Sequence, residues 1–170
     1  MKPVLLALSF LSQEHCTQLS ETFELVYAPD AQGHQGAIVT HGARVRVVLT
    51  IGSVGLTAAQ MDGLPELTLV CALGAGYENI AVAYAKARGI VVANGAGTND
   101  DCVADHAIGL LIAAVRGIPK LDVATRAGVW RTSLPLPPNL SHKRLGIVGL
   151  GAIGKKIARR ALGFDLQVGY

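Results

Sequence analysis

Residues 145–154 read "LGIVGLGAIG", and this stretch decides the fold of the second half of the chain. Gly149, Gly151 and Gly154 have the spacing G-x-G-x-x-G between an apolar run and a helical pattern. In such a turn the first glycine permits the tight bend, the second lets a pyrophosphate approach the backbone, and the third lets the helix lie close to the strand. The N-terminus of the helix then offers unpaired N–H groups to phosphate oxygens. The stretch therefore predicts a strand, a turn and a helix that bind a dinucleotide.

The residues that follow the glycine turn support this interpretation. The spacing alone is a weak signal, because a glycine turn that only packs has the same pattern. Here a second β-type run, "LQVGY" at residues 166–170, follows the helical pattern at a suitable distance. The residue that distinguishes NAD from NADP comes just after that run, so the expected cofactor is NADP or NAD. Four basic residues of the helix are interpreted as a solvated face and not as a 2′-phosphate site: Lys155, Lys156, Arg159 and Arg160.

The composition of the chain excludes several classes of protein. With 51% hydrophobic and 16% charged residues in 170 positions, the chain indicates a well-buried α/β protein. The net charge of +3 is small and the basic residues are spread along the chain, so no nucleic-acid partner is expected. Cys16, Cys71 and Cys102 lack metal-ligand and redox spacing, which predicts reduced thiols in a cytoplasmic protein and no metal site. No membrane segment is expected, because the apolar stretch 103–115 contains Asp105 and is shorter than the ~20 residues of a span.

Short aliphatic runs alternate with helical patterns in the first 97 residues, which favours a parallel sheet with crossover helices. The apolar start of the chain is interpreted as a buried strand and not as a signal peptide, since no cleavage site follows. Thr57 and Gln60 have the spacing of a capping box, Asn79 is a candidate cap for the next helix, and Gly89 suits the left-handed end of that helix. The expected strands are residues 4–8, 24–27, 45–49, 68–72 and 90–93.

A joint, "NGAGTNDD" at residues 94–101, precedes a helix expected over residues 103–116. That helix is apolar nearly all round, which predicts burial against another domain or another subunit. His106 lies inside the helix and is interpreted as structural. Pro119 is expected to close this helical region, and a shorter helix is expected at residues 120–126.

Four segments resemble a known family, and they occur in the family's order. They are "LGAGYENI" at residues 73–80, "GIVVANGAGTNDDCVADHA" at 89–107, "RAGVW" at 126–130 and "LGIVGLGAIGKKIARR" at 145–160. Together they resemble the D-isomer-specific 2-hydroxyacid dehydrogenase family, and within it the bacterial glyoxylate or hydroxypyruvate reductases. The departures are small: Ala81 stands where relatives often have aspartate, and "NGAG" replaces Asn-Thr-Pro-Gly at the joint.

The resemblance implies an α/β fold in two parts. Residues 1–97 would form a flavodoxin-like substrate domain, and residues 98–170 would form the first, incomplete part of a Rossmann dinucleotide-binding domain. A homodimer is also implied, because the long helix after the joint packs across a dimer axis in relatives. The 170 residues are accordingly expected to be a segment of a longer polypeptide.

The resemblance also implies a reaction and a set of site residues. The protein would be an NAD(P)-dependent oxidoreductase that transfers hydride between the nicotinamide cofactor and a small 2-oxo or 2-hydroxy acid, as a glyoxylate or hydroxypyruvate reductase does. The family's catalytic arginine, glutamate and histidine lie beyond residue 170, so no catalytic residue is assigned within the chain. The implied substrate-binding residues are Leu73, Gly74, Ala75, Gly76 and Asn99, and the implied cofactor-binding residues are Val103, Gly149, Leu150, Gly151, Ala152, Ile153 and Gly154.

Other interpretations of these residues remain open. The turn at residues 73–76 could be an ordinary connection between a strand and a helix, Asn99 could be a loop or helix-capping residue, and Val103 could be a core valine. For the whole protein, the alternatives are a nucleotide-gated, corepressor-like or scaffolding binding protein and a phosphoglycerate- or formate-type dehydrogenase. The presence or absence of the three catalytic residues after position 170 would separate the enzymes from the binding protein.

Overall fold

The structure, a computed structural model, describes residues 2–170 and consists of two compact units. The division falls between Thr98 and Asn99, one residue after the boundary expected from the sequence. Each unit has an apolar core of its own. No helix between residues 2 and 170 combines the length and the apolar character of a membrane span.

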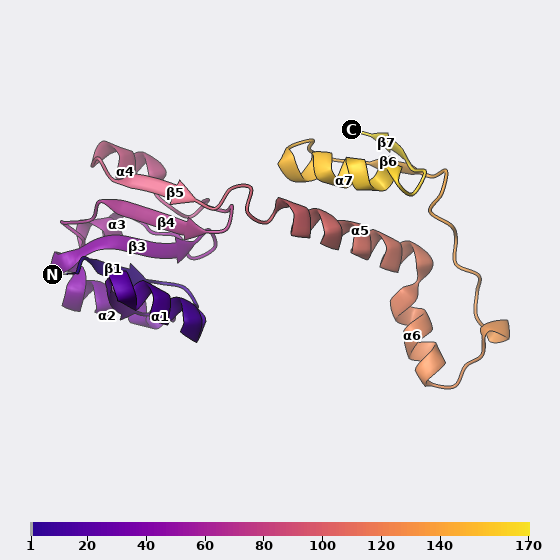
Figure 1. The fold of residues 1–170 in the computed structure, drawn as a ribbon, viewed down its shortest axis with the longest axis horizontal. Coiled ribbons are helices and arrows are strands. Elements are labelled where there is room, and N and C mark those ends of the chain that lie inside the picture. Colours follow the sequence, from indigo (N-terminus) through magenta and orange to yellow (C-terminus); the bar gives the residue numbers. More distant parts are fainter. Residues whose placement is uncertain (1) are drawn as a thin grey trace. The chain divides into compact units, whose positions relative to one another are not determined.

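The first unit is built on a five-stranded sheet in which all neighbouring strands are parallel (Figure 1). Its strands are β1 (Val4–Ala7), β2 (Glu24–Tyr27), β3 (Val45–Ile51), β4 (Leu69–Leu73) and β5 (Val91–Asn94). Their order is β2-β1-β3-β4-β5, which is the flavodoxin-like order. The strands lie within one or two residues of their predicted positions, because strands buried on both faces form short aliphatic runs that are visible in a sequence.

Four helices cover the two faces of this sheet: α1 (Gln13–Thr22), α2 (Ala31–His41), α3 (Ala58–Asp62) and α4 (Val82–Ala87). Helices α2, α3 and α4 contribute Ile38, Met61 and Ala85 to the larger core, which also contains Leu6 of β1. Helix α1 packs on the opposite face, where a smaller core contains alternate residues of β1. The sheet therefore has apolar contacts on both faces, as a parallel sheet requires.

Capping residues were predicted for the N-termini of two helices, α3 and α4. Thr57 and Gln60 form the predicted capping box of α3: the Gln60 N–H donates to Thr57 Oγ1 over 3.2 Å, and the Thr57 N–H donates to Gln60 Oε1 over 2.8 Å. The prediction for Asn79 is wrong. Helix α4 has Ala81 at its N-cap position, and the Asn79 amide donates instead to the Ser53 carbonyl over 3.1 Å.

The second unit contains two consecutive helices and a strand–helix–strand unit. Its elements are α5 (Asp100–Arg116), α6 (Ile118–Arg126), β6 (Arg144–Gly146), α7 (Ala152–Leu162) and β7 (Gln167–Gly169). The two strands are parallel, with Leu145 opposite Val168. Helix α5 packs against α7, and Ile108 and Ala161 lie in the core that they share. The predicted strand, turn and helix around the glycine motif are therefore confirmed.

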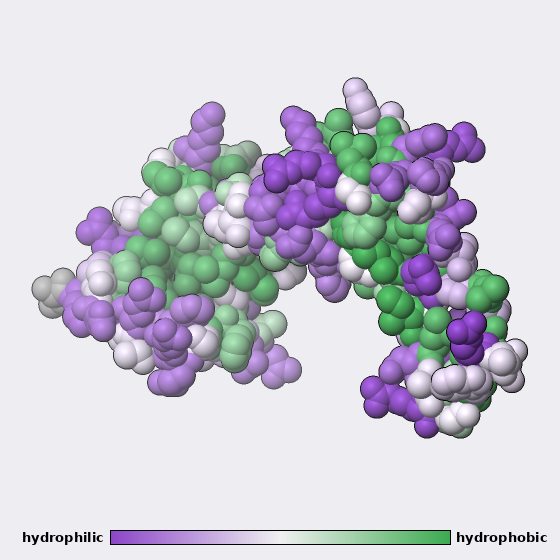
Figure 2. Space-filling model, turned by 45° about the vertical axis from the view of Figure 1, so that its right-hand side comes forward, coloured by the Kyte–Doolittle hydropathy of each residue, from purple (hydrophilic) through white to green (hydrophobic). Residues whose placement is uncertain are grey.

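The long helix α5 begins three residues before its predicted start and ends at the predicted residue, Arg116. Within this chain only one of its faces is buried: Ala104 and Ile108 are buried, whereas Leu110 is 58% exposed. His106 is exposed within this chain. Burial of the remaining apolar residues against another domain or another subunit stays a prediction. Figure 2 shows in green the apolar residues that reach the surface.

Pro119 also has a different place from the one predicted. Helix α5 ends at Arg116 and is followed by Gly117, which has a left-handed φ of 63°, and Pro119 lies in the first turn of α6. Proline is tolerated there because the N–H groups of a first turn have no partner within the helix. Pro119 thus opens the shorter helix.

Candidate functional site

A short loop, Gly74–Gly76, follows β4 at the carboxyl edge of the first sheet. Leu73 is the last residue of the strand, and Gly74 has a left-handed φ of 81°. Two successive carbonyl oxygens of the loop are hydrogen-bonded to residues at the end of β5. The Gly95 N–H donates to the Gly74 oxygen over 2.7 Å, and Asn94 Nδ2 donates to the Ala75 oxygen over 2.7 Å. The backbone of the loop is therefore held by its neighbour strand.

These two hydrogen bonds determine the direction of the loop's N–H groups. In a trans peptide the C=O and the N–H of one peptide unit point in opposite directions. Because the carbonyls of Gly74 and Ala75 point toward β5, the N–H groups of Ala75 and Gly76 point away from it. Neither N–H donates to an acceptor among residues 2–170. Successive unpaired N–H groups in a turn form a concave site for an anion such as a carboxylate.

The loop after β3 lies against this turn. A Cβ atom on Gly52 would lie 2.5 Å from the carbonyl carbon of Gly76, 2.7 Å from Oε2 of Glu78 and 2.8 Å from the Gly76 Cα, so only glycine fits at position 52. The Glu78 carboxylate therefore lies beside Gly76, and a bound anion has to share this edge of the loop with it. Sequence reasoning did not identify Gly52 or Asn94. A glycine directly after the aliphatic run of β3 was the available signal for Gly52. Asn94 gave no signal, since its contact with Ala75 joins two loops that are distant in the sequence.

The glycine turn of the second unit has the geometry that its spacing predicts. Gly149 has a φ of 93°, a conformation that favours glycine. A Cβ atom on Gly154 would collide with the carbonyl oxygen of Gly149. The helix can therefore lie this close to the turn only because position 154 has no side chain. A Cβ atom on Gly151 would meet no atom within 4 Å. Open space beside the backbone at position 151 is what a pyrophosphate would need.

The N-terminus of α7 adds hydrogen-bond donors to this turn. Gly151 is at the N-cap position and has no side chain that could satisfy them, and the first helical hydrogen bond runs from the Lys155 N–H to the Gly151 carbonyl over 3.0 Å. The N–H groups of Ala152, Ile153 and Gly154 are left without helical partners. Together with the positive end of the helix dipole, they fit the phosphates of a dinucleotide. Leu150 lies half-buried between the first two glycines of the motif.

Two of the four basic residues of α7 are partly exposed and also form ion pairs with α5 that the sequence did not predict. Lys156 Nζ lies 2.5 Å from Asp101 Oδ2 of α5. Arg160 bonds Asp105 through Nε over 2.5 Å and Asp101 through Nη2 over 3.1 Å. Hydrogen bonds from Lys156 and then Arg160 hold the pKa of the Asp101 carboxyl below its usual range. These two basic side chains therefore join α7 to α5, while Lys155 remains exposed.

Asn99 and Val103 lie at and near the start of α5. Asn99 occupies the N-cap position, but its side chain makes no capping hydrogen bond. Its Oδ1 is buried without a hydrogen-bond partner among residues 2–170. Val103 is 37% exposed and is not a core residue of the second unit. Asn99 thus stands at the helix N-terminus without a side-chain cap, and Val103 is partly exposed within this chain.

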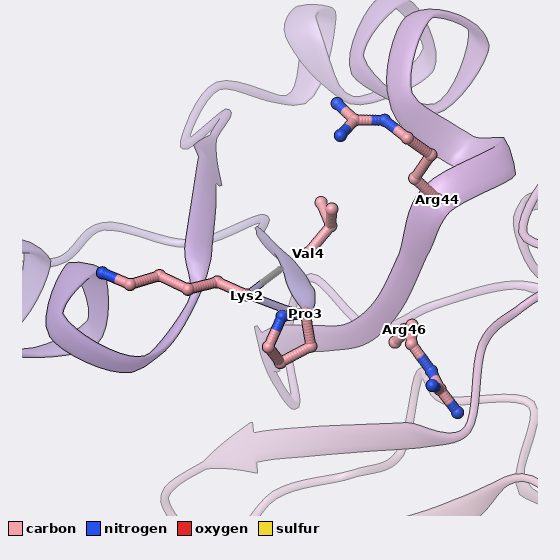
Figure 3. A pocket seen from close by; sticks show the side chains of 5 residues that line it. All are labelled: Lys2, Pro3, Val4, Arg44 and Arg46. Carbon is pink, nitrogen blue, oxygen red and sulfur yellow. The ribbon is translucent and has the colours of Figure 1, made fainter.

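A cavity of about 450 Å³ lies at the opposite, amino edge of the first sheet, between Lys2, Val4 and Arg46. Figure 3 shows that its basic side chains point in different directions. Lys2 donates to the Ser20 carbonyl, and Arg44 is paired with Glu24 through two hydrogen bonds. The cavity therefore does not present convergent charges to an anion. Residues 2–170 also contain no group of three or more His, Cys, Asp or Glu side chains that could hold a metal ion.

Comparison with known proteins identifies the family. Residues 5–152 match the model of the D-isomer specific 2-hydroxyacid dehydrogenase, catalytic domain. A 2-hydroxyacid dehydrogenase from Ketogulonicigenium vulgare has a TM-score of 0.90 and 30% identity, over 99% of this chain and 54% of that one. An NADPH-dependent glyoxylate/hydroxypyruvate reductase from Sinorhizobium meliloti, solved with NADP and malonate, has a TM-score of 0.86 and 32% identity, over 100% of this chain and 53% of that one.

A curated relative gives the same result. A glyoxylate/hydroxypyruvate reductase of Arabidopsis thaliana is 36% identical over 132 residues, which are 76% of this chain and 41% of that protein. The chain thus spans about half the length of the proteins it matches. The resemblance inferred from the four sequence segments and the fold class inferred with it are confirmed. The chain belongs to the D-isomer-specific 2-hydroxyacid dehydrogenase family.

Proposed function

We propose that the protein containing this chain is an NAD(P)-dependent oxidoreductase that reduces glyoxylate or hydroxypyruvate, or a closely similar 2-oxo acid. One observation carries the proposal: the turn at Gly149–Gly154 leaves open space at Gly151 beside free N–H groups of α7. That arrangement suits the pyrophosphate of a dinucleotide. The names of the S. meliloti and A. thaliana relatives support the choice of substrate.

The two units have separate roles in this function. In residues 1–97, the substrate domain, Leu73 and the loop 74–76 bind the carboxylate of the 2-oxo acid through the N–H groups of Ala75 and Gly76. In residues 98–170, the first part of the Rossmann domain, the backbone of residues 149–154 binds the pyrophosphate. Asn99 donates to a substrate oxygen, and Val103 contacts the nicotinamide ring.

The bound cofactor would supply the hydride, and the chain's own residues would bind and orient the reactants. Both nicotinamide dinucleotides share the pyrophosphate that the turn fits, so the proposal covers NADP and NAD. Lys156 and Arg160 are not assigned to a 2′-phosphate, because both are paired with carboxylates of α5. The proposal places the family's catalytic arginine, glutamate and histidine outside residues 1–170.

The test is the activity of the full-length gene product. Oxidation of NADPH and of NADH is followed with glyoxylate, hydroxypyruvate and phosphohydroxypyruvate, and reduction of NADP and NAD is followed with formate. Turnover of glyoxylate or hydroxypyruvate with either cofactor is expected. Turnover of phosphohydroxypyruvate or formate alone would replace the proposed substrate. Tight cofactor binding without turnover of any substrate would favour the corepressor-like or scaffolding protein.

The proposal includes a homodimer in the cytoplasm. Apolar side chains are exposed on the two consecutive helices of the second unit: Leu110 is 58% exposed, Ile118 is 48% exposed and Val123 is 68% exposed. Burial of such side chains against a second copy would be favourable. The three cysteines, Cys16, Cys71 and Cys102, are free thiols, which suits a reducing compartment. Light scattering of the full-length protein tests the dimer.

A further inference from the structure

We infer that Asn94 is a positioning residue for the anion-binding loop: its side chain holds the N–H group of Gly76 in the direction that receives a substrate carboxylate. The inference rests on the proposed function, since the carboxylate is that of the 2-oxo acid. Asn94 is the last residue of β5 and pairs with Ala72 of β4. Its backbone position therefore lies beside the strand that leads into the loop.

The contacts of Asn94 show what it holds. Asn94 Nδ2 donates to the Ala75 oxygen over 2.7 Å, and the next residue, Gly95, donates its N–H to the Gly74 oxygen over 2.7 Å. The backbone of β5 thus orients one peptide unit of the loop, and the Asn94 side chain orients the next. The second unit, between Ala75 and Gly76, carries the N–H of Gly76. Among residues 2–170, no other hydrogen bond is made to the Ala75 carbonyl.

The loop needs such a restraint because of its composition. Glycine has more backbone freedom than any other residue, and Gly74 and Gly76 flank Ala75 on both sides. Without the Asn94 hydrogen bond, the peptide unit between Ala75 and Gly76 can rotate, and binding a carboxylate then costs the free energy of ordering it. A loop held in its binding conformation before the ligand arrives avoids that cost.

The contact requires a side chain at position 94 that can donate a hydrogen bond to the Ala75 carbonyl. A carboxylate has only acceptors, so an aspartate would face the Ala75 oxygen without a proton to donate. A serine keeps a donor on a shorter side chain. The residue type at position 94 therefore predicts how well the loop binds an anion.

The experiment measures steady-state kinetics of the full-length protein with glyoxylate and hydroxypyruvate, using whichever nicotinamide cofactor supports turnover. The variants are Asn94→Ala, Asn94→Asp and Asn94→Ser. Thr68→Val is the matched control, because Thr68 Oγ1 likewise donates to a backbone carbonyl of a neighbouring strand, that of Arg46, over 3.1 Å, at the amino edge of the same sheet. Thermal unfolding of each variant reports whether it folds.

In Asn94→Ala the KM for the 2-oxo acid is expected to rise about 3- to 10-fold, the loss that one hydrogen bond accounts for. The KM for the nicotinamide cofactor is expected to stay unchanged. Asn94→Asp should raise the KM for the 2-oxo acid further, Asn94→Ser should recover part of the loss, and Thr68→Val should leave both KM values unchanged.

Folded Asn94 variants that retain the wild-type KM for the 2-oxo acid would overturn the role of Asn94 but leave the proposed function intact. A rise in both KM values together would also overturn it, because a general loss of structure would have that effect. A wild-type protein that reduces no 2-oxo acid would overturn the proposed function, and the inference with it.

Discussion

The carbonyl oxygen of Gly149 occupies the space that a side chain at position 154 would need. Gly154 lies in the first turn of α7 and is buried, so neither the turn nor the helix can move aside without disturbing the core of the second unit. We expect Gly154→Ala to lower the free energy of unfolding by at least ~2 kcal/mol, as overpacking against backbone does. Chemical denaturation measures this change. A loss below ~0.5 kcal/mol would contradict the close approach of helix and turn.

An alanine at position 151 should affect dinucleotide binding and not stability. A Cβ on Gly151 meets no atom within 4 Å, so Gly151→Ala should change the free energy of unfolding by less than ~1 kcal/mol. The methyl group would lie beside the free N–H groups of α7, where the pyrophosphate is proposed to bind. We expect a loss of dinucleotide affinity of about 10-fold or more, or ~1.4 kcal/mol, in a calorimetric titration. Unchanged affinity together with unchanged stability would place the dinucleotide elsewhere.

Gly52 provides a corresponding test of the loop after β4. A Cβ at position 52 would lie 2.5 Å from the carbonyl carbon of Gly76, so Gly52→Ala should displace the turn that the proposal assigns to the substrate. We expect the KM for the 2-oxo acid to rise by about 10-fold or more. Gly36→Ala in α2 is the control, because a Cβ there meets no atom within 4 Å and alanine favours a helix by ~1 kcal/mol over glycine. An equal KM in the two variants would contradict the assignment of the turn.

The pairs between α5 and α7 predict a dependence of stability on pH. Hydrogen bonds from Lys156 and then Arg160 lower the pKa of Asp101 in the folded state. The stabilisation is therefore fully present above the unfolded-state pKa, near ~3.9, and is lost as the pH falls through the lower folded-state pKa. Asp101→Asn should remove this acid-dependent part of the stability, and high salt should weaken it, because these side chains face solvent. If the free energy of unfolding depends on pH in the same way in the wild type and in Asp101→Asn, the ion pairs of Asp101 do not contribute to the stability.

Several elements could be predicted from the sequence because their signals are local. The five strands of the first sheet are aliphatic runs, the capping box of Thr57 and Gln60 depends on residues three apart, and Gly89 has the expected left-handed φ of 72° after α4. The glycine turn at residues 149–154 is local as well. In each case neighbouring residues along the chain determine the conformation.

Other features could not be predicted because they depend on contacts between distant segments. The role of Asn94 requires the Ala75 carbonyl, nineteen residues away, and the pairing of Lys156 requires Asp101, fifty-five residues away. The exposure of His106 within this chain likewise depends on the packing of α5 against α7, which the composition of the helix does not reveal. The candidate site therefore combines a predictable glycine motif with partners that only the fold reveals.

A crystal structure of the full-length protein with NADPH or NADH is the measurement that decides whether α7 binds a dinucleotide. We expect pyrophosphate oxygens within hydrogen-bond distance of the N–H groups of Ala152 and Ile153, above the open space at Gly151. A bound dinucleotide whose pyrophosphate lies away from residues 149–154 would contradict the proposed cofactor site.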